Sequence, residues 1–503
     1  MIKNMKINNE KMVTENFHGI SYIHHAYEFM PDDKGRILNE EQIQVEINNM
    51  KNMGITMIRS FYGGSLTWDD EKKEHNFESE YMMAFYKACK MFADAGIEVG
   101  ITPGWHISGF IKDWMPEGKK FSVNLDYHGG FVEGDLEATA KNFEKFIEDS
   151  VYAFERHGVT NIKHIFCFTE CNNCFNYNNR AEKDAKKVSS FERREIERLY
   201  PLYDRMIRAV DQGLKNSGKR DQFKIVAPCD NWSGDASEPI SWMVKYTVEN
   251  LSEQVDIIGA HNGYDRSFDF KDKRAFYDLL DAKLTYPRDK AKEYGKEYYV
   301  DEFNVVLHSV YTCVRSLEAN DNPYRGLAFG AMMNKILNMG GIHTLYIWAL
   351  YSQQWPNWTY GGINAEFLDG IQILGYLHNL RHTRVPTYPW YAAAMMTRQL
   401  KEGNAYEGDD NENTYISYLE RADGETVILV TNYEDEEVEL TADIAKSLGG
   451  KNFYKYVYTT TNVVPDANAD MIKASGEVKD VTDKLCDTVP ALSVTVYTTE
   501  KPE

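Results

Sequence analysis

The sequence of 503 residues contains no apolar run near the roughly 20 residues that a membrane-spanning helix requires. Its longest apolar segments, such as residues 345–351, have the length of a buried strand. Residues 1–12 include lysines, but neither an apolar stretch nor a small-residue cleavage site follows them, which argues against a secretory signal. We therefore expect a soluble protein with no membrane partner.

Positive charge is in short supply as well. The chain has 56 lysine and arginine residues against 77 aspartate and glutamate residues, which gives a formal net charge of -21. A surface of this sign repels polyanions across most of its area. Nucleic acid is therefore not an expected partner, whereas association into a homo-oligomer is left open.

Cysteine is also scarce. The chain has seven cysteines, an odd number, and three of them, Cys167, Cys171 and Cys174, fall in one short segment. A disulfide framework favours an even number at regular spacings, so this pattern favours a reducing compartment. We expect the protein to be cytoplasmic.

Short apolar segments alternate with helical patterns over residues 17–402. The segments with strand-like composition are residues 17–27, 55–61, 97–106, 165–170, 223–232, 255–264, 298–302 and 344–350. Between two of them, Asp135 is placed to cap a helix with a buried stripe, and Gly158 is placed to end it. Eight strands separated by helices predict an α/β protein whose catalytic domain is a (β/α)₈ TIM barrel.

The pattern changes from about residue 403. Residues 415–419, 426–431 and 492–498 alternate apolar and polar residues at period two, and Asp423-Gly424 has the composition of a hairpin turn. Residues 403–503 are therefore expected to form a C-terminal antiparallel β-sandwich domain. The N-terminal segment, residues 1–16, could contribute a further strand to it.

Two of the predicted barrel strands end in a glutamate followed by a polar loop. Glu170 ends the fourth strand and Glu302 ends the seventh. Parallel barrel strands deliver such side chains to the same C-terminal rim. Cleavage of a glycosidic bond uses two carboxyl groups there, one protonated to donate to the leaving oxygen and one ionised to attack the sugar carbon. The pair therefore predicts a glycosidase.

With these glutamates, Trp348 at the end of the eighth strand and a C-terminal β domain, the whole chain resembles the clan A glycoside hydrolases, most closely families 39, 30 and 5. The resemblance implies a retaining mechanism with Glu170 as acid/base and Glu302 as nucleophile. It also implies that Arg59 steadies the nucleophile and that Trp348 stacks on a sugar ring.

The chain departs from the clan at two positions. Thr169 stands where the clan usually has an asparagine that binds the sugar hydroxyl beside the reacting carbon. The clan also often has a tyrosine near the end of the sixth strand that touches the nucleophile. Tyr264 matches that tyrosine approximately in spacing, and His261 is the other candidate.

Further residues beside the predicted rim could bind substrate. Trp105 could stack on a sugar ring or pack in the core, and the two alternatives are about equally supported. His106 and Asn173 could bond sugar hydroxyls, although structural roles explain a histidine or a loop asparagine at least as well. We include all three among the expected substrate-binding residues.

Two other classes of function remain open. The spacing of Cys167, Cys171 and Cys174 is similar to that of the radical SAM enzymes, which hold an iron–sulfur cluster, although here Cys167 falls inside a predicted strand. A barrel that binds carbohydrate without catalysis is the other alternative. The histidines lack the spacing of a recognised metal set, so no metal is expected.

We therefore predict a retaining glycoside hydrolase. It would cleave a β-type glycosidic bond in oligosaccharides or small glycosides by double displacement, with carbohydrate as its partner and with no cofactor.

Overall fold

The computed structural model describes most of the chain. The described residues are 1–24, 40–62, 67–69, 71–103, 135–169, 200–231, 240–268, 273–307, 323–348, 354–355, 359–360, 363–364, 367–368, 386–411, 413–463 and 470–502.

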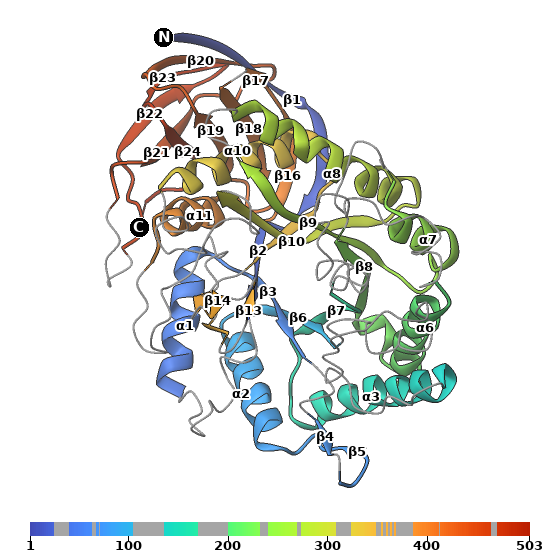
Figure 1. Cartoon of the computed structure of the whole chain (residues 1–503). Helices are drawn as coiled ribbons and strands as arrows, with labels where there is room; N and C mark the ends of the chain where they lie inside the picture. The colour runs from blue at the N-terminus through green and yellow to red at the C-terminus, as the bar shows by residue number, and fades with distance from the viewer. Residues whose placement is uncertain are drawn as a thin grey trace.

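Eight parallel strands close into a barrel, and each lies in one of the segments predicted from the sequence (Figure 1). They are β2 (Ile20–His24), β3 (Met57–Phe61), β6 (Glu98–Thr102), β7 (Ile162–Phe166), β8 (Lys224–Asn231), β9 (Ile257–Phe268), β10 (Glu297–Leu307) and β11 (Thr344–Ile347). Neighbouring strands follow one another in chain order around the barrel, and β11 closes it against β2. The predicted TIM barrel is confirmed.

Helices surround this barrel in the order expected from the sequence. They are α1 (Glu40–Met53), α2 (Glu80–Asp94), α3 (Leu136–Arg156), α6 (Tyr200–Asn216), α7 (Trp242–Asn250), α8 (Lys273–Glu293), α10 (Pro323–Met339) and α11 (Tyr388–Gln399), with a 3₁₀ turn η6 (Arg220–Gln222) before β8. As predicted, the Asp135 carboxylate caps α3 by accepting a hydrogen bond from the Ala138 amide at 2.9 Å. Gly158 then follows the helix in the left-handed conformation.

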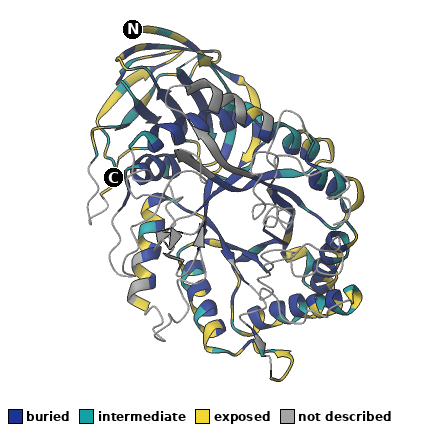
Figure 2. Cartoon of the chain, in the orientation of Figure 1, coloured by how far each residue is buried: buried dark blue, intermediate teal, exposed yellow. Residues whose placement is uncertain are grey.

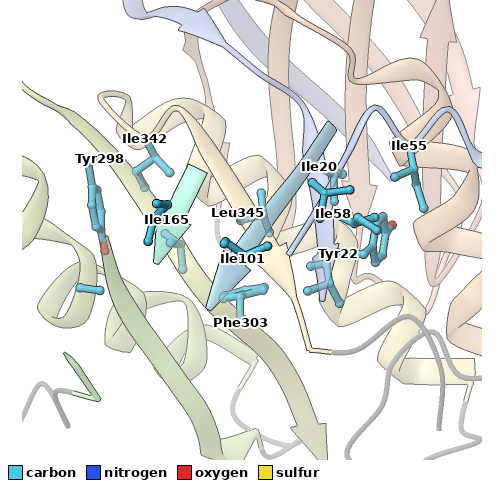
Figure 3. Packing of buried hydrophobic residues seen from close by; sticks show 14 of the residues in the cluster. Ile20, Tyr22, Ile55, Ile58, Ile101, Ile165, Tyr298, Phe303, Ile342 and Leu345 are labelled. Atoms are coloured by element: carbon cyan, nitrogen blue, oxygen red, sulfur yellow. The ribbon is translucent and has the colours of Figure 1, made fainter. Parts of the chain in front are cut away.

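The core lies between the strands and these helices. On α2, α3 and α6 buried and exposed residues lie on opposite faces (Figure 2), whereas α10 and α11 are buried along nearly their whole length. Figure 3 shows aliphatic and aromatic side chains of successive barrel strands, including Ile58, Ile101, Ile165 and Leu345, packed in this layer. Burial of this apolar layer holds the strand ends in fixed relative positions.

A second sheet forms the β-sandwich-like domain predicted for the C-terminal part of the chain. Its strands are β1 (Ile2–Phe17), β16 (Gly403–Gly408), β17 (Asp410–Asn411), β18 (Thr414–Arg421), β19 (Thr426–Asn432), β20 (Val438–Ile444), β21 (Lys451–Thr459), β22 (Gly476–Val481), β23 (Lys484–Val489) and β24 (Ser493–Thr498). The N-terminal strand β1 lies between β16, to which it is antiparallel, and β20, to which it is parallel.

Helix α10 joins the barrel to this second sheet. Asn334, in the middle of the helix, donates from Nδ2 to Ser417 Oγ and to the Leu429 carbonyl, both at 2.9 Å. Its Oδ1 accepts from Thr431 Oγ1 at 2.7 Å. A Cβ at Gly330 would lie 2.4 Å from a methyl carbon of the sheet, so the helix approaches the sheet closely because this residue is glycine. The two domains therefore share a tightly packed, hydrogen-bonded boundary.

Short strands also pair outside the two large sheets. They are β4 (Trp68–Asp69) with β5 (Glu74–His75), β12 (Gln354–Trp355) with β15 (Phe367–Leu368), and β13 (Thr359–Tyr360) with β14 (Ile363–Asn364). Within the described part of the chain, no helix has the length and apolar character needed to cross a bilayer.

Candidate active site

A β-bulge in β10 shapes the centre of the site. Val300 and Phe303 lie three residues apart on β10, but their partners lie only two residues apart on both neighbouring strands, β9 and β11. One extra residue is therefore accommodated within Asp301-Glu302. In a regular strand two successive side chains point to opposite faces. The bulge relaxes this alternation, and both carboxylates reach the same histidine.

That histidine is His261, which lies on the neighbouring strand β9. Its Nδ1 lies 2.9 Å from Asp301 Oδ1, and its Nε2 lies 3.0 Å from Glu302 Oε2. All three side chains are nearly inaccessible to solvent: His261 is 3% exposed, Asp301 0% and Glu302 4%. Burial disfavours a charged imidazole, but the two carboxylates outweigh it and raise the pKa of His261 well above its ordinary value.

Arg59 connects this group to the rest of the rim. From β3, its guanidinium donates to Asp301 twice, from Nη1 to the carbonyl oxygen at 2.6 Å and to Oδ2 at 3.0 Å. Nε donates to Thr102 Oγ1 at 2.9 Å, and Nη2 donates to Thr169 Oγ1 at 2.7 Å and to the Phe168 carbonyl at 3.3 Å. One buried side chain thus connects three barrel strands, β6, β7 and β10.

The charges in this group complement one another. Burial alone would raise the pKa of Asp301, but its contacts with His261 and Arg59 outweigh burial and lower that pKa, so the carboxylate stays ionised. Two cations, His261 and Arg59, therefore face two carboxylates, Asp301 and Glu302. Buried charges persist only when they are paired and hydrogen-bonded in this way.

The structure brings four of the predicted site residues together: Arg59, Thr169, His261 and Glu302. Of the two candidates, His261 contacts Glu302. The backbone of Tyr264 continues β9, but its side chain is not among the described ones. Glu170, Trp105, His106 and Asn173 lie outside the described residues.

Trp348 follows β11 and is 6% exposed. It belongs to the apolar cluster inside the barrel, together with Phe166, Tyr299 and Tyr346, and its amide donates to the Phe303 carbonyl at 2.8 Å. These contacts fix the indole at the rim end of the barrel interior. Its stacking on a sugar ring stays a prediction.

Asp301 is the residue of this group that the sequence analysis missed. It stands between Val300 and Glu302 in a strand predicted to be buried, and an acidic residue at such a position is rarely buried unless it is paired. That mismatch could have singled it out. The β-bulge that turns Asp301 toward His261 could not be predicted, because no local sequence pattern marks it.

A further buried carboxyl group, Asp230, lies on β8 beside this network. Its Oδ2 accepts a hydrogen bond from Ser241 Oγ at 2.8 Å, and Ser241 caps α7, so the carboxyl lies between the barrel wall and that helix. Burial, aided by the charge of Asp301, raises the pKa of Asp230 to about 7. Cys229, just before it, has a positive φ of 56° at a bulge in β8.

The cysteine alternative finds no support in the described residues. Cys167 is fully buried in the core between the barrel and the helices, and burial raises the pKa of its thiol. A cluster ligand has to be a thiolate, which such surroundings disfavour. Cys171 and Cys174 lie outside the described residues.

The described histidines also have other partners than a metal ion. His24, at the end of β2, pairs through Nε2 with Glu46 Oε2 on α1 at 3.2 Å, so its ring is engaged with the helix layer. No three His, Cys, Asp or Glu side chains in the described part of the chain are arranged to hold a metal ion.

A cavity of about 750 Å³ opens at the opposite end of the barrel, between the N-terminal ends of its strands and the second domain. Glu98, Lys224 and Glu297, near the starts of their strands, contribute to its lining, as does Asp423 of the second domain. The cavity lies at the N-terminal ends of the strands, so it is separate from the group around His261. In TIM barrels chemistry occurs at the other end, where the strands have their C-termini.

No protein-family model and no curated protein sequence matches the chain. Its fold, however, is similar along its whole length to that of several solved glycoside hydrolases. Xyn30A, a glycoside hydrolase family 30 subfamily 8 xylanase from Clostridium acetobutylicum, has a TM-score of 0.59 at 13% identity, covering 98% of this chain and 99% of that one.

Two further solved structures with a similar fold are named for other activities. AbfB, a family 51 α-L-arabinofuranosidase from Bifidobacterium longum, has a TM-score of 0.56 at 13% identity, covering 98% of this chain and 99% of that one. An endo-β-1,6-glucanase has a TM-score of 0.56 at 13% identity, covering 100% and 94%. At these identities the likeness concerns the fold, and for the fold the predicted resemblance to clan A glycoside hydrolases is confirmed.

Proposed function

We propose that the protein is a retaining glycoside hydrolase acting by double displacement, with Glu302 as nucleophile and Glu170 as acid/base. The observation that carries the proposal is the pair of contacts made by Arg59, which binds Thr169 and Asp301. These two residues directly precede Glu170 and Glu302 in the chain. The solved structures with a similar fold are named as a xylanase, a glucanase and an arabinofuranosidase, and these names support carbohydrate as the substrate.

Chain geometry connects these contacts to the chemistry. Successive Cα atoms are about 3.8 Å apart, so a residue can lie no further than that from its predecessor. Retention requires two carboxyl groups about 5–5.5 Å apart across the scissile bond. A single guanidinium that binds both preceding residues keeps the attachment points of the two glutamates within the range that such a pair needs.

The proposed reaction has two steps. Glu302 Oε attacks the anomeric carbon while the bond to the leaving oxygen breaks, and Glu170 gives its proton to that oxygen. Water then attacks the same carbon, its proton goes to Glu170, and the bond to Glu302 breaks. The reaction is hydrolysis and requires no cofactor. We propose a β-type bond in an oligosaccharide or a small glycoside as the substrate.

A test begins with a panel of aryl glycosides that includes β-xyloside, β-glucoside and α-L-arabinofuranoside. Glu302→Ala is expected to lower kcat on the best substrate by about 10⁴-fold or more, because a nucleophile acts in both steps. Azide should restore turnover and give a product of inverted configuration. Glu297→Ala, at the other end of the same strand, is the matched control and should keep most of the activity.

Glu170→Ala separates the two roles. Substrates with good leaving groups need little protonation, so this variant should lose much less activity on them than on natural glycosides. Equal losses on both would remove Glu170 from the acid role, and appreciable turnover by Glu302→Ala without azide would remove Glu302 from the nucleophilic role. Sugar binding without turnover by the unmodified protein would favour a non-catalytic barrel.

A further inference from the structure

The histidine between the two acidic residues of β10 carries an inference about Asp301. Asp301 Oδ1 and Glu302 Oε2 lie 2.9 and 3.0 Å from the two different ring nitrogens of His261. An ionised carboxylate only accepts hydrogen bonds, whereas a neutral imidazole offers one N–H donor and one bare nitrogen. A neutral ring leaves a bare nitrogen beside one of the two carboxylates, whereas an imidazolium presents N–H on both sides. The arrangement therefore favours the imidazolium.

We propose that Asp301 is a positioning residue of the reaction: it holds His261 doubly protonated, with Nε2 beside the Glu302 carboxylate. Because Asp301 Oδ2 and its carbonyl oxygen are held by Arg59, the carboxylate has a fixed orientation, which it passes to the ring through Nδ1. The role of Asp301 rests on the proposed role of Glu302 as nucleophile.

The charged groups around His261 come from three strands. Asp301 and Glu302 face it from β10, and their charges favour its protonated form. From β8, Asp230 interacts with it electrostatically; ionisation of Asp230 would favour the same form. From β3, Arg59 disfavours a second cation, but its charge is directed at Asp301. The negative groups around the ring therefore outweigh the positive one.

The imidazolium affects the two steps differently. During attack Glu302 loses its negative charge to a new bond with the sugar carbon, so its ion pair with His261 weakens. During hydrolysis the carboxylate is regenerated as the leaving group, and a fixed positive charge beside the returning negative charge stabilises that transition state. His261 keeps its protons throughout. Its charge should therefore favour the second step over the first.

The variant Asp301→Asn tests this role because it keeps the shape and removes the charge. Loss of one adjacent carboxylate is expected to lower the pKa of His261. On an activated aryl glycoside, for which hydrolysis of the intermediate limits kcat, kcat should fall by about 10–100-fold above the new pKa. KM should fall with it, since the intermediate accumulates, and the basic limb of the kcat profile should move to lower pH.

A matched control is available in the same barrel. Glu46→Gln removes the charge from the Glu46–His24 pair, which is also buried but lies on the helix side of the first strand. It should lower stability without moving the basic limb and without lowering kcat and KM together. The same effects from both variants would show that Asp301 acts only through stability.

Direct titration completes the test. Nitrogen-15 NMR of histidine-labelled protein, with the signal assigned by His261→Gln, should show both ring nitrogens protonated at pH 7 in the unmodified chain. A neutral ring there would overturn the inference, as would an unchanged pKa and basic limb in a folded Asp301→Asn protein. Should no glycoside be turned over, the proposed function fails, while the titration still decides the state of the ring.

Discussion

Replacing Arg59 with lysine keeps a positive charge but removes the planar fork of donors. The guanidinium makes five hydrogen bonds to four residues, which lie on β6 and β10 and directly after β7. An ammonium has three N–H donors and radiates them from one atom, so at least two of these bonds are lost. Arg59 is fully buried, so water does not replace them.

The expected cost follows from these contacts. A hydrogen bond from a charged group contributes about 1.5–3 kcal/mol, so losing two lowers the free energy of unfolding by about 3–6 kcal/mol. The loss should also affect catalysis, because Thr169 and Asp301 precede the two proposed catalytic glutamates. A misplacement on the order of 1 Å reduces the rate by about 100-fold, and we expect a fall in kcat/KM of that order.

Chemical denaturation and steady-state kinetics measure the two effects. Arg421→Lys is the control, because Arg421 is buried in the second domain and pairs there with Asp423 and Glu500. It should lower stability and leave kcat/KM close to that of the unmodified protein. If Arg59→Lys retains both stability and activity, then the guanidinium does not hold the strand ends together, and the argument for the paired glutamates loses its support.

Two further predictions concern stability. Asn334→Ala removes three buried hydrogen bonds between α10 and the second sheet and should lower the free energy of unfolding by about 2–4 kcal/mol in denaturant titrations; a change below about 1 kcal/mol would contradict this reading of the boundary. The pKa of Asp230 rises from an ordinary 3.8 to about 7 on folding, so its protonated form adds stability that is complete below about pH 4 and is lost as the pH rises through about 7. Asp230→Asn should flatten the pH dependence of unfolding over this window, and an unchanged slope would show that the carboxyl ionises freely in the folded chain.

The barrel could be predicted because each strand is a short apolar segment with a helix on either side. The segment 255–264, for example, has buried Ile257 and Ile258 where the prediction placed a strand. The site could be predicted less completely from the sequence. Glu302 could be identified because an apolar segment precedes it, although β10 continues beyond it to Leu307. Asp301 could not, since regular alternation would turn one of the two side chains away from the site.

Long-range packing decides such details. The bulge in β10 depends on the register of both neighbouring strands, and the contacts of Arg59 join residues more than 100 positions apart in the chain. Neither is encoded in a local pattern of apolar residues. His261 could be named from the sequence only as a candidate, and the structure shows its contact with Glu302.

The position of β1 in the second sheet bears on how the chain is assembled. This strand is synthesised before its two neighbours, β16 and β20, which follow it by about 400 residues. At about 5–20 residues per second, the ribosome needs roughly 20–80 s to supply them. Throughout this interval the strand presents open edges that other chains could pair with, so the growing polypeptide depends on its early barrel segments or on chaperones to keep those edges covered.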